Sequence, residues 1–245
     1  LVGSEMCIRD SYNYYQYVPH RTTSYLNHAV YNTYVNDESA LYNQADVFFN
    51  IQAKYTINAS MMYALALNES GLGLSQYALE YHNLFGHAAI DENPDNANQY
   101  KSIADCVKQH AYNFLQQGYL NPEDSRYYGS WFGDKASGIN VNYASDPYWG
   151  EKAASFYYQL DEDGIDQKKN PIKIIQLSKD LKVYAPNKKD VIYTHKKGSI
   201  VSIHILKEEN RYYKISSEAP VKDNHLNVNC LLYTSPSPRD RTRSR

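Results

Sequence analysis

Glu69 is the residue of this sequence best placed to act as a proton donor. It closes an almost unbroken apolar run of good helix formers that fills most of Thr56–Gly73. A helix that is apolar nearly all round is buried, so the carboxyl is expected at the C-terminal end of a core helix. Partial desolvation and the negative end of the helix dipole both favour the protonated form there. A carboxyl that stays neutral near pH 7 suits a general acid, whereas a frayed, solvated helix end would leave an ordinary carboxylate.

The elements that would position this group are mostly helical. Asn58 is the expected N-cap of the helix, and Gly71 and Gly73 are expected to stop it. Apolar periodicity and capping residues predict four further helices, at Ser39–Tyr55, Ser75–Tyr81, Ser102–Gln117 and Ser145–Gln159. Gly, Pro and Asn residues argue against regular helix in His82–Asn98 and in residues 121–138. The sequence therefore predicts a mostly helical region with an irregular lobe beside a cleft.

This helical region carries three motifs in a fixed order. They are ALNESGLG around Glu69, HNLFG at residues 82–86 and NYASDPYWGEKAASFYY at residues 142–158, with YQYVPHRT at residues 15–22 before them. From about Tyr12 to Asp161 the chain resembles the bacterial N-acetylglucosaminidases of glycoside hydrolase family 73, which are lysozyme-like peptidoglycan hydrolases of the autolysin type. The resemblance implies an α+β, mostly helical, lysozyme-like domain. It also implies an endo-acting enzyme that cleaves the β-1,4 bond after N-acetylglucosamine in the glycan strand.

The resemblance assigns roles to individual motif residues. Glu69 matches the catalytic acid, and Tyr143 is expected close to it, where it helps to position the sugar. The alternative for Tyr143 is a tyrosine at the edge of the core whose hydroxyl finds a backbone acceptor. Four further residues are expected to line the substrate cleft: Asn83, Phe85, Tyr148 and Trp149. Trp149, at the start of a helix, suits the core equally well.

The second carboxylate that glycoside hydrolysis usually needs is not fixed by a motif. Asp91, Glu92 and Asp95 follow NLFG in a loop long enough to border the cleft. Asp91 is the first choice because the apolar run before it could hold it at the end of an ordered strand, with Glu92 on the opposite side. A solvated turn residue is the alternative for each of the three. The substrate's own N-acetyl group could also replace the second carboxylate.

Other chemistries are less well supported by the sequence. Cys106 and His110 lie four residues apart on a predicted helix, but nothing marks the thiol as activated, and a buried structural Cys is expected. The histidines show no recognisable metal spacing, so we expect no metal and no cofactor. Two departures from the family pattern bear on subsite preference. Leu72 stands where relatives more often carry Trp, and histidines flank NLFG where other residues are common.

The two ends of the chain differ in character from the rest of the sequence. Residues 1–11 and 231–245 resemble translated sequencing-adapter sequence rather than evolved protein. The remainder holds 20 basic and 24 acidic residues, so the basic tail does not indicate nucleic-acid binding. No apolar run is long enough for a membrane span. We expect a monomer that is secreted or associated with the cell wall. No signal peptide is visible, and the natural N-terminus is expected to lie upstream.

The pattern changes after residue 161. Residues 12–161 form the expected glucosaminidase domain, and residues 162–171, which are charged and contain Gly and Pro, are expected to be a linker. Residues 172–230 contain short runs of alternating apolar residues that predict a small all-β barrel of the Src-homology-3-like type.

Two further functions stay open. One is a wall-binding module that keeps the cleft but is catalytically weak or inactive, and the other is a muramidase or lytic transglycosylase on the same general fold. The expected partner in every case is the peptidoglycan glycan strand.

Overall fold

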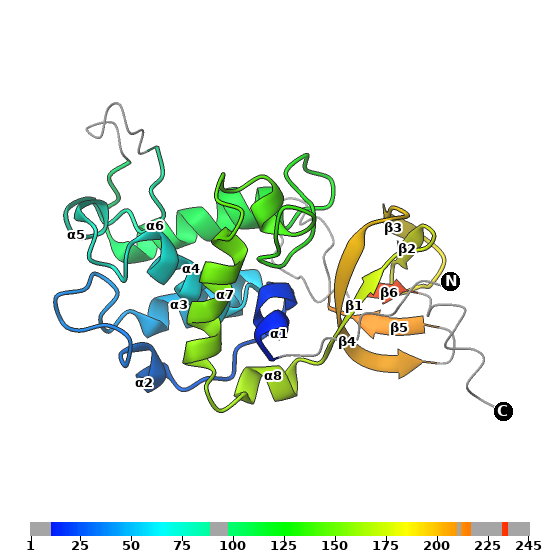
Figure 1. The fold of residues 1–245 in the computed structure, drawn as a ribbon, viewed down its shortest axis with the longest axis horizontal. Helices are drawn as coiled ribbons and strands as arrows, with labels where there is room; N and C mark the ends of the chain where they lie inside the picture. The colour runs from blue at the N-terminus through cyan, green and yellow to red at the C-terminus, as the bar shows by residue number, and fades with distance from the viewer. Residues whose placement is uncertain (1–10, 89–97, 210–211, 217–231, 235–245) are drawn as a thin grey trace.

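The computed structural model describes residues 11–88, 98–209, 212–216 and 232–234. Helices occupy the first two thirds of the chain, and antiparallel strands follow from residue 172 (Figure 1). The helices are α1 (Ser11–Tyr17), α2 (His28–Tyr31), α3 (Ala45–Tyr55), α4 (Ala59–Glu69), α5 (Gln76–Tyr81), α6 (Ile103–Gln109), the π-helix η2 (His110–Tyr119), the 3₁₀ turn η3 (Ile139–Val141), α7 (Trp149–Leu160) and α8 (Ile165–Lys169). The strands are β1 (Ile172–Gln176), β2 (Leu181–Tyr184), β3 (Val191–His195), β4 (Ile200–Glu209), β5 (Tyr212–Ile215) and β6 (Leu232–Thr234). The fold is therefore α+β, as predicted.

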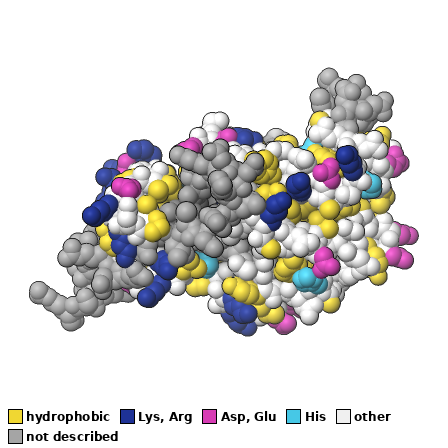
Figure 2. Space-filling view, turned by 180° about the vertical axis from the view of Figure 1, so that it is seen from behind, with side chains coloured by type: hydrophobic (Ala, Val, Ile, Leu, Met, Phe, Trp, Pro, Cys, Tyr) yellow, Lys and Arg dark blue, Asp and Glu magenta, His cyan; other side chains and the backbone are white. Residues whose placement is uncertain are grey.

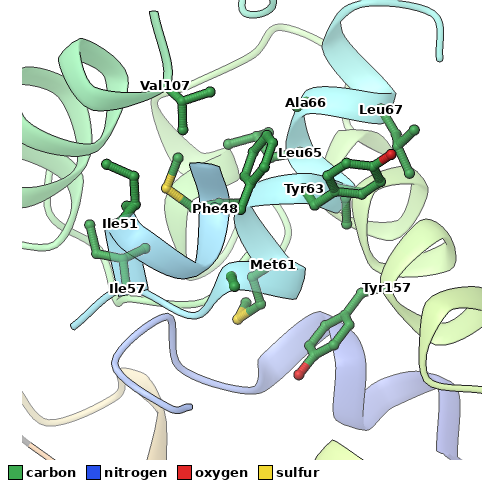
Figure 3. Packing of buried hydrophobic residues seen from close by; sticks show 14 of the residues in the cluster. Phe48, Ile51, Ile57, Met61, Tyr63, Leu65, Ala66, Leu67, Val107 and Tyr157 are labelled. Carbon is green, nitrogen blue, oxygen red and sulfur yellow. The ribbon is translucent and has the colours of Figure 1, made fainter. Parts of the chain in front are cut away.

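Helix α4 is the centre of the helical core. Every residue from Ala59 to Leu67 is buried, and α4 packs against α3 on one side and α7 on another (Figure 3). Apolar side chains from all of these helices surround it, so the all-round apolar pattern is explained by burial. Asn58 caps the helix by accepting a hydrogen bond from the Met61 N–H at 3.0 Å. The predicted core helix and its cap are both confirmed.

The other predicted helices are found with altered boundaries. Helix α5 and its Ser75 cap match the prediction. Helix α3 begins only at Ala45, because residues 39–43 form turns that pack against the loop after Glu69. The helix predicted at Ser102–Gln117 changes from α to π at His110. Helix α7 begins at Trp149 rather than Ser145, since Asp146 and Pro147 form the preceding turn.

The strands form one antiparallel sheet with the order β1-β4-β5-β6-β2-β3. β1 and β3 stand at the two ends of this order, and no described strand pair joins them, so the predicted small barrel is not confirmed. β6, which lies in the segment expected to be adapter-derived, pairs with both β2 and β5. The apolar core of the sheet includes Trp131, a fully buried residue of the helical region. The sheet therefore packs on the helical part.

The segment expected to be a linker is structured. It contains α8, whose Asp166 is fully buried and accepts hydrogen bonds from the Tyr25 N–H at 2.6 Å and the Tyr157 hydroxyl at 2.9 Å. Asn170 donates to the Thr23 carbonyl at 2.9 Å. The charged composition predicts a solvated linker, but these polar groups form hydrogen bonds with buried partners rather than with water. The linker prediction is therefore wrong for this segment. Residues 165–170 belong to the packed helical part.

Surface charge differs between the two ends of the molecule. On the face seen in Figure 2, acidic and basic side chains are interspersed over the helical end, and basic side chains are frequent over the strands. None of the helices in the described ranges is long and apolar enough to cross a membrane.

Candidate active site

Glu69 is the last residue of α4, and the backbone turns sharply just after it. Gly71, Leu72 and Gly73 all have positive φ, at 56°, 63° and 78°. A Cβ on Gly73 would lie 2.3 Å from the Ser39 Oγ, so glycine is required by close packing as well as by φ. Ser39 donates to the Leu72 carbonyl at 2.7 Å, which braces the turn. The ESGLG sequence thus ends a core helix and holds its final carboxyl at a fixed position.

The Glu69 carboxyl is partly buried and has two side-chain donors. The Trp149 indole N–H donates to Glu69 Oε1 at 2.5 Å, and the Asn68 amide lies 3.5 Å from the same oxygen. Burial raises the pKa of Glu69 above its ordinary value, and the hydrogen bonds from Trp149 and Asn68 oppose part of that rise. The group therefore keeps its proton to a higher pH than a solvated Glu, which is the property a general acid needs.

Tyr143 lies close enough to this carboxyl for the Glu69 charge to influence its phenol. It is half-buried, and its ring packs on Trp149 with centroids 4.6 Å apart. Burial, followed by the nearby Glu69 charge, raises the pKa of Tyr143 well above its ordinary value, so the phenol is neutral. Lys135 supports this loop by donating to the Asn140 carbonyl at 2.7 Å and to the Ala144 carbonyl. Lys135 was not predicted, and no sequence pattern points to it.

The central residues of HNLFG, Asn83 to Phe85, are buried and form a wall rather than an exposed contact surface. The Asn83 amide accepts from the His87 N–H at 3.0 Å and donates to the His87 carbonyl at 2.9 Å, which closes the turn. The Phe85 ring stacks on His110 with centroids 3.8 Å apart. Both side chains are at most 5% exposed. They shape the structure around the site, and direct contact with a sugar would need them to be more open.

Two buried histidines, His87 and His110, stack on the Phe85 ring. His87 Nε2 is 2.9 Å from His110 Nδ1, and His87 Nδ1 is 2.6 Å from the Tyr100 hydroxyl. Burial lowers the pKa of His87 to about 4 and lowers the pKa of His110 well below its ordinary value, so both rings are neutral near pH 7. Burial raises the pKa of the Cys106 thiol to about 12. This agrees with a structural Cys and gives no support to a thiol nucleophile.

Tyr148 and Trp149 separate into two different environments. The Tyr148 side chain is 61% exposed and can present its ring to a ligand. Trp149 is 4% exposed, and its ring is part of the core. The prediction that this ring offers a flat face to a sugar is therefore not supported. Asp146 accepts from the Tyr148 N–H at 2.9 Å and forms a salt bridge with Lys152, consistent with a role in the turn before α7.

The acids proposed as the second carboxylate lie outside the described residues. This applies to Asp91, Glu92 and Asp95 alike. Within the ranges that are described, no group of three or more His, Cys, Asp or Glu side chains could hold a metal ion.

The site combines a carboxyl of raised pKa at the end of a core helix with a neutral phenol and an indole N–H. These are groups that acid catalysis can use. Residues 45–162 match the family model Glucosaminidase, described as mannosyl-glycoprotein endo-beta-N-acetylglucosaminidase. This part of the chain is similar to the glucosaminidase family and contains Glu69, Tyr143 and Trp149.

Two curated relatives come from strains TIGR4 and R6 of Streptococcus pneumoniae, and each is named "Putative endo-beta-N-acetylglucosaminidase". Each is 35% identical over 133 residues, which is 51% of this chain. The chain spans only 18% and 17% of the lengths of these relatives.

Solved structures of similar shape include Staphylococcus aureus autolysin E. That structure is 21% identical, with a TM-score of 0.45 over 63% of this chain and 74% of the autolysin. A mutant of autolysin E in complex with the disaccharide NAG-NAM is 19% identical, with a TM-score of 0.45 over 66% of this chain and 75% of that one.

Proposed function

We propose that this chain is an endo-β-N-acetylglucosaminidase that hydrolyses the peptidoglycan glycan strand at the β-1,4 bond after N-acetylglucosamine. The observation that carries the proposal is the Glu69 carboxyl at the end of α4, partly buried and with a raised pKa, inside the part of the chain that is similar to the glucosaminidase family. The names of the pneumococcal relatives support the same activity. A wall hydrolase acts outside the cytoplasm, so the protein is proposed to be secreted or wall-associated.

In this proposal Glu69 donates its proton to the leaving glycosidic oxygen as the bond to the anomeric carbon breaks. Tyr143, neutral and adjacent, positions the sugar, and the exposed ring of Tyr148 contacts the glycan further along. Asp91 is proposed as the second carboxylate. A separation from Glu69 of roughly 6.5–9.5 Å would leave room for the attacking water of an inverting enzyme, and about 5 Å would indicate a covalent, retaining route. If neither Asp91 nor its neighbours act, the substrate's N-acetyl group takes this role.

The domain organisation is also a proposal. Residues 12–161 would carry the chemistry, with residues 165–170 as part of the same packed unit. Residues 172–230, together with β6, would form a Src-homology-3-like module that packs on this unit and increases affinity for the wall. Two linked binding units gain from effective concentration even when each binds weakly.

Glu69→Gln tests the function directly. The amide keeps the shape of the side chain and removes the acid, so turnover on purified peptidoglycan should fall by roughly 10²–10⁴-fold. Glu80→Gln, at an exposed position of α5, is the matched control and should leave turnover unchanged. Mass spectrometry of wild-type digests should show N-acetylglucosamine at the new reducing end.

Four results would contradict the proposal. New N-acetylmuramic acid ends would identify a muramidase, and anhydro ends would identify a lytic transglycosylase. Equal turnover by wild type and Glu69→Gln would mean that Glu69 is not the acid. A wall-binding module without activity is the remaining alternative, and it predicts no new reducing ends from the wild-type chain.

A further inference from the structure

The indole of Trp149 contacts the proposed acid from inside the core. Its Nε1–H donates to Glu69 Oε1 at 2.5 Å, and the side chain is 4% exposed. An indole nitrogen is a donor only, so Oε1 must act as the acceptor whether the carboxyl is neutral or ionised. The carbonyl oxygen of a neutral carboxyl is a better acceptor than its hydroxyl oxygen, so this contact favours the proton on Oε2. A Glu at a free helix end would have no such preference between its two oxygens.

The surrounding structure holds the indole in this position. Trp149 is the first residue of α7, and its ring lies against Tyr143 on one side and edge-on to Phe132, with centroids 6.0 Å apart, on another. The next residue, Gly150, packs so closely that a Cβ there would lie 1.9 Å from the Gly133 carbonyl oxygen. Helix α7 also packs along α4, the helix that carries Glu69. These contacts hold the indole donor in place.

We propose that Trp149 is a positioning residue, which fixes the acidic proton of Glu69 on Oε2 and stabilises the carboxylate that remains after proton transfer. This inference rests on the proposed function of Glu69 as the acid. The proton leaves Oε2 for the glycosidic oxygen, and the electron pair of the O–H bond stays on the carboxylate. The indole N–H bond to Oε1 then stabilises the new negative charge, because hydrogen bonds to charged acceptors are stronger than those to neutral ones.

Trp149→Phe tests the inference, since it keeps an aromatic ring and removes the donor. Loss of a donor to the carboxylate favours the protonated form, so the pKa of Glu69 should rise by about one unit. The alkaline limb of the pH profile of kcat/KM, which reports the acid of the free enzyme, should move up by the same amount. Turnover at the optimum should fall by about tenfold or more, because the proton is no longer held on one oxygen.

The chain offers a matched control in its only other tryptophan. Trp131 is also fully buried, and its indole N–H donates at 3.2 Å to the Ser137 hydroxyl rather than to a carboxyl. Trp131→Phe should lower the melting temperature through lost packing and leave the Glu69 pKa and the pH profile unchanged. A shift of equal size in both variants would mean that the effect comes from general loosening of the core, and would overturn the inference.

Two measurements do not depend on catalysis. The first is NMR titration of the ¹³C-labelled Glu69 carboxyl, assigned by its absence in Glu69→Gln. A pKa in Trp149→Phe equal to or below that of wild type would overturn the positioning role. A raised pKa in a protein that does not cleave peptidoglycan would overturn the proposed function and leave the contact established.

The second measurement covers the case in which Trp149→Phe does not fold. In Trp131→Phe, Trp149 is the only remaining indole, and its emission should change with pH as its hydrogen-bonded carboxyl gains or loses charge. The additional Glu69→Gln substitution should abolish that change. An emission titration that is the same with and without Glu69 would overturn the inference.

Discussion

Asp166→Asn should change how the stability of this protein depends on pH. Asp166 lies in the segment that composition identified as a linker, yet its carboxyl is buried. Burial raises its pKa from 3.8 to about 6, against the opposing hydrogen bonds from Tyr25, Ser24 and Tyr157. The charge of Asp161 adds to the rise. An exposed linker carboxyl would show no such shift.

The direction in which stability changes with pH follows from proton binding at Asp166. Between pH 3.8 and about 6 the folded state binds more protons at Asp166 than the unfolded state, so stability falls as pH rises through this window. A shift of this size corresponds to about 3 kcal/mol at 1.36 kcal/mol per unit. Asn cannot titrate. The free energy of unfolding of Asp166→Asn minus that of wild type should therefore increase by about 2–3 kcal/mol from pH 4 to pH 7.

Urea unfolding at four or five pH values measures this difference directly. The difference between variant and wild type cancels the contributions of all other titrating groups, provided that they behave alike in both proteins. Asp163→Asn is the control and should give a flat difference, because Asp163 is exposed and lies two residues before α8 in the same charged segment. A flat difference for Asp166→Asn as well would refute the conclusion that this segment is part of the packed core.

Two other expectations concern binding. Tyr148→Ala should raise KM for glycan by about 3- to 10-fold, which is the scale of one aromatic contact. The melting temperature should stay unchanged, because the ring is 61% exposed. Tyr128→Ala, which removes a 51% exposed ring, is the control. A chain ending at Pro171 should still cleave short soluble glycans but bind whole walls more weakly. Its melting temperature should fall, because Trp131 loses its packing contacts with the sheet. Full retention of wall binding would contradict a targeting role for the sheet.

The sequence was sufficient to predict the core helix and the residue at its end. An all-round apolar run has one physical solution, burial on every side, and Asn58 and the glycines after Glu69 fix its ends. The predicted start of α3 at Ser39 was wrong, because Ser39 and its neighbours pack against the turn after Glu69. Periodicity in one segment cannot reveal such a contact with another segment. The prediction of a linker at residues 162–171 was wrong for a similar reason. Charge in a sequence does not show whether a carboxylate faces water or a buried donor.

The candidate site was predictable only where a motif held the residue. Tyr143 packs on Trp149, and its role beside Glu69 stays a prediction. For Trp149 the sequence allowed either a sugar contact or a place in the core, and its buried indole donates to Glu69. The ring type suited both roles, and only the direction of the side chain separates them. Lys135, which holds the Tyr143 loop through backbone carbonyls, has no sequence signal because such contacts do not depend on the acceptor's side chain.

The position of Glu69 depends on two helices that are joined at both ends. At one end the Trp149 indole, from the start of α7, binds the Glu69 carboxyl at the end of α4. At the other end the amide of Asn58, which caps α4, donates to the hydroxyl of Tyr157 on α7 at 3.2 Å. That hydroxyl in turn donates to Asp166 on α8. Because each Tyr157 contact orients the next, removing α8 would loosen the cap of the helix whose far end carries the proposed acid, and the unit that performs the chemistry should therefore extend to residue 170 rather than stop at residue 161.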